Sequence, residues 1–401
     1  MPSKHSRNDL EKKFLSGKIP VALDETTYER FSDRNTIFAR VSWDQSFPAY
    51  QRRISERESQ KVGTPGYSHV AYAARSAAWT IYDNFREAFA WNRIGEQEQK
   101  GPTEVTTELP KYEPANPEEG AKIVKKVAQI YGAADVGICE LDPDLNFVYT
   151  HNRQDEPIQF PEGVKYAIVM AIKMDFDGIA TSPALPASIA TGHGYSQMAF
   201  TIACLAEFLR NLGYTAIPAG NDLGLSVPLA IQAGLGEVGR NGLLIHPKFG
   251  QRVRICKVFT DFPMAIDKPI HFGAVRLCRV CKKCAKHCPS NSISRGEPTW
   301  ESPWNSISNN NGAFKWYVNV ESCYRYWVRN SSDCSNCIRA CPFTKPPGFS
   351  HDIARFFIKY FPFLNRFWVL LDDIMGKIPI WQYGKQKNPE KFWKSKDYLK
   401  K

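Results

Sequence analysis

The chain has 401 residues, of which 43% are hydrophobic and 23% charged, and a formal net charge of +11 at pH 7. A chain of this length can bury a core large enough to fold without disulfide bonds, so its 11 cysteines are not the framework of a small secreted domain. The positive charge suits acidic redox proteins, anionic lipid or nucleic acid, and by itself it selects none of these partners.

The N-terminal region is polar and irregular, with one helix predicted over residues 70–89 from the helical spacing of its aromatic side chains. Residues 1–14 are charged and lack the apolar run of a signal peptide, and the pair Arg52-Arg53 is followed by polar residues. No targeting segment is therefore recognised, which favours a cytoplasmic protein. The prolines of residues 101–117 indicate a linker.

From residue 118 the pattern becomes that of an α/β (α+β) protein. Segments with apolar residues at helical spacing alternate with short apolar segments bounded by turn residues, which predict strands. The predicted helices are 118–131, 188–212 and 227–233, and the predicted strands are 136–141, 147–150, 166–174, 215–217 and 253–260.

A glycine-rich turn follows the last of these helices. Its run Gly234-Leu235-Gly236-Glu237-Val238-Gly239 matches the dinucleotide fingerprint, but that fingerprint follows a strand and opens a helix, and this run does neither. Two interpretations remain. Either the backbone approaches a flat or bulky group here, or the glycines form a tight structural turn.

Eight cysteines form two runs in the C-terminal part of the chain. The first run, Cys-x2-Cys-x2-Cys-x3-Cys-Pro from residue 278, has the spacing of bacterial ferredoxins, in which the fourth thiolate crosses to the other cluster. The second run, from residue 323, is a stretched copy, and the proline-flanked triple run argues against structural zinc sites. Crossing the fourth ligands predicts two [4Fe–4S] clusters, one held by a first cysteine set of Cys278, Cys281, Cys284 and Cys341 and one by a second cysteine set of Cys288, Cys323, Cys334 and Cys337.

The most apolar stretch, residues 353–375, is interrupted by arginine, lysine, proline and aspartate, so it is not an ordinary membrane span. Its aromatic and basic composition fits either packing onto the rest of the protein or an interfacial helix. We expect packing.

The run from Asn221 to Gly250, together with Arg252 to Asp261, resembles the corrinoid-dependent reductive dehalogenases. The cysteine spacing, including the stretched second run, agrees with that family, and so does the run from Asp33 to Arg40. The resemblance extends over roughly residues 30–350.

The resemblance implies a nitroreductase-like core and a base-off cobamide, a cobalamin-type corrinoid whose lower cobalt position takes no protein histidine. The absence of a D-x-H-x-x-G motif agrees with this. The expected corrinoid contacts are Ser226, Gly234, Gly236, Gly239, Asn241 and Gly242. The implied regions are an N-terminal extension covering the active site (1–115), the cobamide-binding core (116–265), a ferredoxin-like two-cluster domain (266–350) and a C-terminal aromatic and basic segment packing on the core (351–401).

Three catalytic residues follow from the same resemblance. Tyr195 corresponds to the family's proton-donating tyrosine, and Asn221 and Arg254 correspond to polar residues that surround it. A neighbouring guanidinium favours the phenolate form of a tyrosine, and an amide can orient its hydroxyl. Thr191 and Phe38 are expected in the substrate pocket.

The implied enzyme is an oxidoreductase that catalyses R–X + 2e⁻ + H⁺ → R–H + X⁻ on an organohalide. Its electrons would come from a ferredoxin, a flavodoxin or a membrane quinol chain, and a membrane-anchor protein and a second copy of the chain are further partners to consider. The alternative location is that of a membrane-associated exported enzyme whose twin-arginine signal has been removed. Two other functions stay open: an epoxyqueuosine reductase-like enzyme acting on tRNA, and an electron-transfer iron–sulfur protein without dehalogenase activity.

Overall fold

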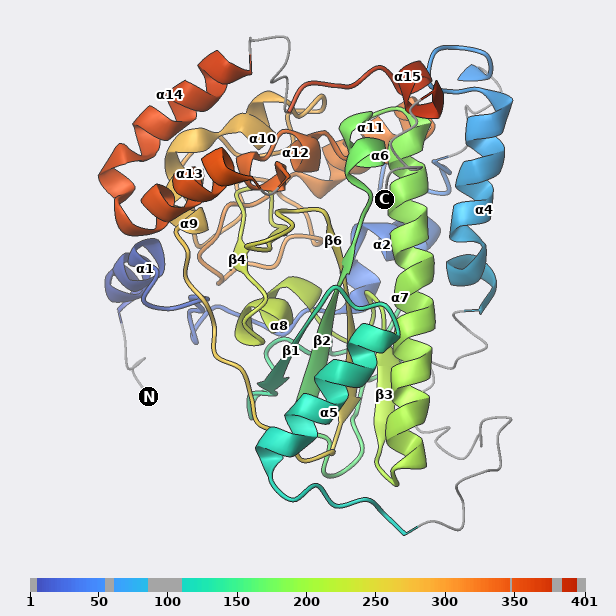
Figure 1. Ribbon diagram of the computed structural model, residues 1–401, viewed down its shortest axis with the longest axis vertical. Coiled ribbons are helices and arrows are strands. Elements are labelled where there is room, and N and C mark those ends of the chain that lie inside the picture. Colours follow the sequence, from blue (N-terminus) through green and yellow to red (C-terminus); the bar gives the residue numbers. More distant parts are fainter. Residues whose placement is uncertain (1–5, 55–60, 86–109, 347, 377–383, 395–401) are drawn as a thin grey trace.

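A four-stranded sheet lies between two apolar cores in the computed structural model, which describes residues 6–54, 61–85, 110–346, 348–376 and 384–394. The strands lie in the order β1-β2-β6-β3, and each neighbouring pair is antiparallel (Figure 1). Their bounds are Asp135–Glu140 for β1, Tyr166–Lys173 for β2, Val253–Thr260 for β6 and Ala216–Ala219 for β3.

Helices cover both faces of this sheet. α5 (Pro117–Ile130) and α7 (Leu185–Asn211) pack on one face, and α8 (Ser226–Gln232) packs on the other. Successive strand residues point to opposite faces, so Ile168 belongs to the core under α7 and Val169 to the core under α8. Because both faces are buried, the two central strands are mostly apolar along their length, β6 with the exceptions of Arg254 and Lys257.

The remaining elements surround this layered core. α4 (His69–Phe85) packs along the outer side of α7 (Figure 1), and a two-stranded hairpin joins β4 (Glu237–Val238) to β5 (Leu244–Ile245). None of the described helices is long and apolar enough to cross a membrane. The other described elements are α1 (Arg7–Ser16), η1 (Asp33–Asn35), α2 (Ile37–Trp43), α6 (Phe176–Ala180), α9 (Ala274–Cys281), α10 (Lys283–Lys286), α11 (Val320–Asn330), α12 (Asn336–Arg339), η3 (Pro342–Thr344), α13 (Phe349–Tyr360), η4 (Pro362–Leu364), α14 (Asn365–Met375) and α15 (Pro389–Lys394).

Most predicted elements are confirmed, and two differ in an informative way. The segment 147–150 is not a strand, because its amides bond to separate segments: Tyr149 N donates to the Leu223 carbonyl and Thr150 N to the Phe31 carbonyl. The long helix begins one turn earlier than predicted, with a proline in its first turn, where the missing amide hydrogen costs no helical bond. The predicted helix 70–89 is α4, and residues 86–89 lie outside the described residues.

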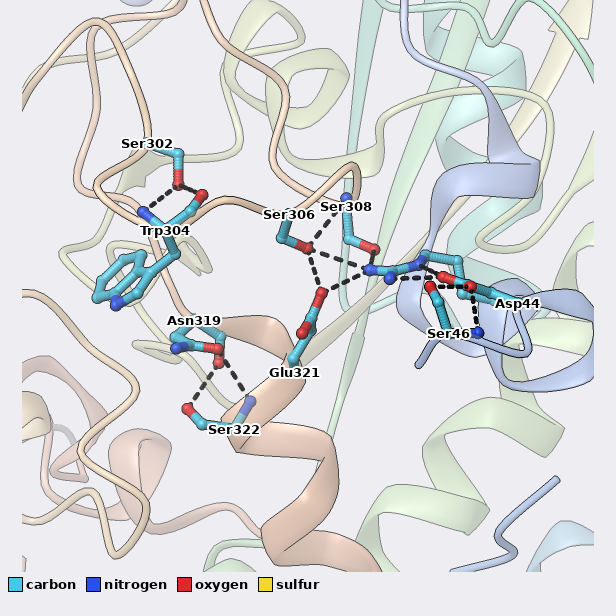
Figure 2. A network of polar contacts seen from close by, with 10 residues as sticks. Asp44, Ser46, Ser302, Trp304, Ser306, Ser308, Asn319, Glu321 and Ser322 are labelled. Carbon is cyan, nitrogen blue, oxygen red and sulfur yellow. Dashed lines mark hydrogen bonds and ion pairs between the residues drawn. The ribbon is translucent and has the colours of Figure 1, made fainter. Parts of the chain in front are cut away.

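A buried arginine fastens the N-terminal region to the cysteine-bearing region. Arg40 of α2 is 6% exposed, and its guanidinium donates to Asp44 at 2.6 Å and to Glu321 of α11 at 2.7 Å. Figure 2 shows Asp44 and Glu321 on opposite sides of the guanidinium group that binds them both, with Ser306 and Ser308 beside it. This contact holds α2 against the helix that carries Cys323 of the second cysteine set.

Replacing Arg40 by methionine is expected to lower the free energy of unfolding by about 3 kcal/mol, because two largely buried carboxylates lose the cation between them. Thermal or denaturant unfolding followed by circular dichroism measures the loss. Arg34→Met is the matched control, since Arg34 makes only a 3.7 Å contact with the exposed Asp155 and a contact of its guanidinium with the Trp43 ring at 4.4 Å, whose loss should together cost about 1 kcal/mol. If both variants lost the same unfolding free energy, Arg40 would not hold the N-terminal region to α11 as described.

Candidate active site and cysteine sites

Three elements bring together the tyrosine, asparagine and arginine that the sequence predicts. Tyr195 lies in the middle of α7, Asn221 in the turn after β3 and Arg254 near the start of β6. The Asn221 amide Nδ2 donates a hydrogen bond of 2.9 Å to the Tyr195 hydroxyl. The guanidinium carbon of Arg254 lies 4.9 Å from the centre of the Tyr195 ring. The Tyr195 side chain thus has a neutral hydrogen-bond donor at its hydroxyl and a permanent cation beside its ring.

Two glycines of α7 make this close packing feasible. A Cβ atom at Gly194 would lie 3.0 Å from Cγ of Arg254, and one at Gly192 would lie 2.4 Å from the ring of Trp79. The Trp79 ring stacks on Tyr195 with centroids 4.9 Å apart and an interplanar angle of 25°. Small residues on α7 therefore admit Arg254 on one side of the tyrosine and Trp79 on another.

Trp79 and Tyr82 of α4 were not among the site residues predicted from the sequence. The ring centre of Tyr82 also lies near Tyr195, at 5.0 Å. Their helical spacing in the sequence marked an apolar face, but spacing along one helix does not say which neighbour that face covers. The sequence therefore showed that this helix has an apolar face, but only the three-dimensional structure shows that the face packs on Tyr195.

A buried lysine holds the turn that carries Asn221. Lys257 of β6 is fully buried, three residues beyond Arg254 on the same strand. Its Nζ atom donates three hydrogen bonds: to the carbonyl of Gly220 at 2.6 Å, to the carbonyl of Gly224 at 3.1 Å and to Ser226 Oγ at 3.0 Å. These bonds span the turn on both sides of Asn221 and fix its position relative to the sheet.

Burial is the main cause of the pKa shifts of Lys257 and of the neighbouring Asp222. Burial lowers the pKa of Lys257 to about 8, although the charges of Asp222, Cys256 and Asp33 oppose the shift. Burial likewise raises the pKa of Asp222 to about 6, while the positive charge of Lys257 opposes that shift. At neutral pH both groups are mainly charged, so each stabilises the other's ionised form.

We expect the free energy of unfolding of the wild type to rise relative to that of Lys257→Met between about pH 8 and about pH 10. In this window the unfolded lysine keeps its proton while the folded one has lost it, so stability increases with pH, by at most about 1.4 kcal/mol per unit. Denaturant unfolding at several pH values measures the divergence. Lys122→Met, on the exposed side of α5, is the control and should run parallel to the wild type. If the unfolding free energies of the wild type and of Lys257→Met differed by the same amount at every pH, the prediction would be wrong.

A cavity of about 550 Å³ joins the tyrosine trio to the second cysteine set. Thr191 and Phe38, the expected substrate-pocket residues, both line it. Phe38 is 48% exposed and contacts Trp327, another lining residue, with ring centroids 5.7 Å apart. Among the described residues, the cysteines that line this cavity are Cys288, Cys323, Cys334 and Cys337.

Several polar atoms at the wall of this cavity are buried and have no hydrogen-bond partner among the described residues. Buried polar groups are nearly always paired, so a bound molecule with its own polar periphery is the natural partner. Such a molecule would need both donors and acceptors around its edge. The atoms are Ser188 Oγ, Thr191 Oγ1, Trp79 Nε1, Trp327 Nε1 and Asn336 Oδ1.

The six residues expected to contact a corrinoid separate into two groups. Ser226 and Asn241 line the cavity, whereas the four glycines do not. Packing within the protein itself requires a glycine at position 236, because a Cβ atom there would lie 2.2 Å from the Ile245 carbonyl oxygen. Gly234 and Gly239 are similarly crowded by protein atoms, and Gly234 and Gly242 have positive φ. The geometry supports the structural-turn interpretation for the glycines, and β4 and β5 are the strands that this turn region joins.

The electrostatic neighbours of Cys341 and Cys323 belong to the crossed sets, while Cys284 of the first set also lies close enough to Cys337 of the second to be influenced by it. Burial raises the pKa of Cys341, and the thiols of Cys278 and Cys281 raise it further although they lie some sixty residues away in sequence. Burial likewise raises the pKa of Cys323, with additions from Cys337, Cys334 and Cys288. In the described part of the chain no three such side chains converge on a point that could hold a single ion. In a four-iron cluster each thiolate binds a different iron, which requires wider spacing.

The two cysteine sets have different surroundings. Three cysteines of the first set, Cys278, Cys281 and Cys341, lie in an apolar cluster with Leu277, Phe343 and Ile358. At the second set, Asn241 lies within hydrogen-bonding reach of the Cys337 thiol and opposes the rise in its pKa that burial causes. The Asn241 amide is itself held by the Gln251 amide through two hydrogen bonds, of 3.0 and 2.6 Å. Hydrogen bonds to sulfur are one of the factors that set the reduction potential of iron–sulfur clusters.

The sequence was also compared with those of known proteins and protein families. Residues 277–345 match the family model of the 4Fe-4S dicluster domain. The chain is 40% identical over 277 residues to the tetrachloroethene reductive dehalogenase of Desulfitobacterium hafniense, covering 59% of this chain and 50% of that protein. It is 31% identical over 391 residues to the tetrachloroethene reductive dehalogenase of Sulfurospirillum multivorans, covering 87% of this chain and 76% of that protein.

Solved structures share the fold. The catabolic reductive dehalogenase NpRdhA, in complex with 3-bromo-4-hydroxybenzoic acid, aligns with a TM-score of 0.68 at 24% identity, over 91% of this chain and 48% of that one. A reductive dehalogenase structure described in terms of B12-dependent dehalogenation aligns with a TM-score of 0.69 at 22% identity, over the same shares of both chains. The chain spans about half the length of the Desulfitobacterium relatives and of these structures. Its identity to the Sulfurospirillum protein extends over three quarters of that relative, and the chain belongs to the reductive dehalogenase family.

Proposed function

We propose that this protein is a cobamide-dependent reductive dehalogenase that replaces a halogen on an organic substrate by hydrogen, R–X + 2e⁻ + H⁺ → R–H + X⁻. One observation carries the proposal. A single cavity has Tyr195, Asn221 and Arg254 in one part of its wall and the four thiols of the second cysteine set in another. A proton donor and an entry point for electrons therefore face the same space.

The cofactors we infer are two [4Fe–4S] clusters, on the first and second cysteine sets, and a base-off cobamide in the cavity of a nitroreductase-like core. The dicluster-domain match and the B12-dependent structural neighbour support this choice. The unpaired polar atoms of Ser188, Thr191 and Asn336 suit the amide-rich edge of a corrin. When bound, the clusters supply single electrons and the cobamide supplies a reducible cobalt centre for cleaving the carbon–halogen bond.

The chain's own residues supply the proton. Asn221 donates its hydrogen bond to the Tyr195 oxygen, so the hydroxyl hydrogen is left to point elsewhere, and the cavity is the open direction. After the proton leaves, the oxygen carries a negative charge, which the guanidinium of Arg254 stabilises from beside the ring. The same fixed positive charge at the cavity wall attracts a departing halide ion.

Aromatic side chains shape the rest of the substrate space. Phe38, Trp327, Trp79 and Tyr82 line the cavity and present apolar rings to it. An organohalide offers little hydrogen bonding, so an apolar pocket with a few placed polar groups is the suitable receptor. Phe38 is held there by α2, whose position depends on the buried contact of Arg40.

The experiment is anaerobic reconstitution of the chain with iron, sulfide and cobalamin, followed by gel filtration. Cobalt and iron are then counted per chain, and free halide is measured with chlorinated, brominated and fluorinated compounds and a low-potential reductant. The proposal predicts that the protein keeps the corrinoid through gel filtration and releases halide from at least one compound. Failure to retain any corrinoid would contradict it.

A further inference from the structure

A basic groove lies away from the substrate cavity, beside the first cysteine set. It has a volume of about 720 Å³ and lies between α9 and the η4–α14 segment. Four basic side chains and one carboxylate line it. They are Arg276, Arg279, Lys282 and Arg366, with Glu297 as the acid.

The groove is next to the cysteines because both belong to α9. Cys278 and Cys281 point into the apolar cluster under this helix, while Arg276 and Arg279 point into the groove. Lys282 follows directly after Cys281. The cysteines that line the substrate cavity, by contrast, are those of the second set. The first set is thus the one with a separate, positively charged approach from solvent.

The basic side chains of the groove make only weak ion pairs within the protein, so they remain able to pair with acidic groups of a partner. Arg279 pairs with Glu297 at 2.9 Å, and both side chains are about half exposed, so this pair contributes little and exchanges readily. Arg276 donates to the carbonyl of Lys359, which leaves its charge uncompensated by that contact. At the rim, Phe363 is 77% exposed and supplies an apolar contact.

We propose that this groove is the docking site of a small acidic electron-carrier protein that delivers electrons to the cluster on the first cysteine set. The proposal rests on the proposed function, which consumes two electrons for each halide released. In each encounter the reduced carrier loses one electron to that cluster and leaves oxidised, so two encounters balance one turnover.

Shape and charge favour a protein over an anionic membrane. A hollow lined by guanidinium groups admits a protruding acidic loop, and carboxylates pair with arginine through two parallel hydrogen bonds. A flat bilayer surface would contact the rim and not the interior. A basic surface around a redox centre also speeds the encounter with an acidic partner by long-range attraction, by about ten- to a thousandfold at low salt.

The test measures cluster reduction directly. Protein reconstituted with both clusters is mixed in a stopped-flow instrument with a reduced acidic ferredoxin, and the bleaching of cluster absorbance is followed without cobamide or organohalide. The double variant Arg279→Glu/Arg366→Glu is expected to be reduced at least tenfold more slowly than wild type at low salt. Its reduction by methyl viologen radical, which needs no docking surface, should not be slowed. Because no dehalogenation is measured, the result stands even if the proposed activity fails.

The matched control is Lys122→Glu/Lys126→Glu, which makes the same change in net charge on the exposed side of α5, far from α9 in Figure 1. An iron count shows that each variant carries its clusters. The proposal is overturned if the groove variant keeps the wild-type rate with ferredoxin, or if the control loses as much. Groove-dependent binding to phosphatidylglycerol vesicles, with an unchanged ferredoxin rate, would assign the surface to lipid and overturn it as well.

Discussion

The variant Tyr195→Phe is expected to release halide about a hundred to ten thousand times more slowly than the wild type, the range that loss of a positioned proton donor costs. Phenylalanine keeps the ring that stacks on Trp79 and lies beside Arg254, so the cavity keeps its shape. Only the hydroxyl that accepts from Asn221 is lost. Initial rates of halide release under saturating substrate measure the effect, with cobalt and iron counted in both proteins.

Tyr82→Phe is the control for this prediction. Tyr82 lines the same cavity and its ring lies 5.0 Å from that of Tyr195, but the hydroxyl that meets Asn221 belongs to Tyr195. We expect Tyr82→Phe to keep most of the wild-type rate. A wild-type rate in Tyr195→Phe would assign the proton to another donor while leaving the rest of the account in place.

The crossed arrangement of cysteines predicts which variants lose the same cluster. Cys341→Ala should remove the cluster of Cys278, Cys281 and Cys284, leaving roughly half of the iron, because Cys341 lies with the first set. Adding Cys278→Ala should then cost no further iron. Adding Cys337→Ala should remove the remaining cluster. Iron analysis and electron paramagnetic resonance of the reduced proteins distinguish these outcomes.

Halide release should fall to background in each of these variants if, as we propose, electrons enter at the cluster of the first cysteine set and pass to that of the second, which borders the cavity. If each run of cysteines instead held its own cluster, the results for the double variants would be exchanged. Cys341→Ala/Cys337→Ala would then retain half of the iron, and Cys341→Ala/Cys278→Ala would retain none.

The parts of the protein that local sequence determines were predictable. Strand 253–260 is buried except at Arg254, and the structure has the predicted bounds. The cysteine spacing indicated the crossed sets, and the thiols that influence Cys341 and Cys323 belong to those sets. The strand signal is carried by neighbours in sequence, whereas the crossed sets join two distant runs and stay a prediction that the spacing of each run makes.

The tertiary parts were not predictable from patterns alone. Tyr195, Asn221 and Arg254 belong to a helix, a turn and a strand, and only the family resemblance singled them out. The position of Lys257 beneath them had no sequence signal, since a lysine in a strand is ordinarily exposed. The sequence left two interpretations open for the glycines after α8, a close approach to a bulky group or a tight turn, and the spacing could not decide because the atoms that approach Gly236 come from its own hairpin.

The most direct test of the account is the ratio of electrons consumed to halide released by protein loaded with both clusters and cobalamin. A reduced donor is titrated anaerobically in the presence of an organohalide, and its oxidation is compared with free halide in the same sample. We expect about two electrons for each halide ion, as the reaction balance requires, and no halide from protein that lacks cobalamin. Donor oxidation without halide release, or equal release without cobalamin, would contradict it.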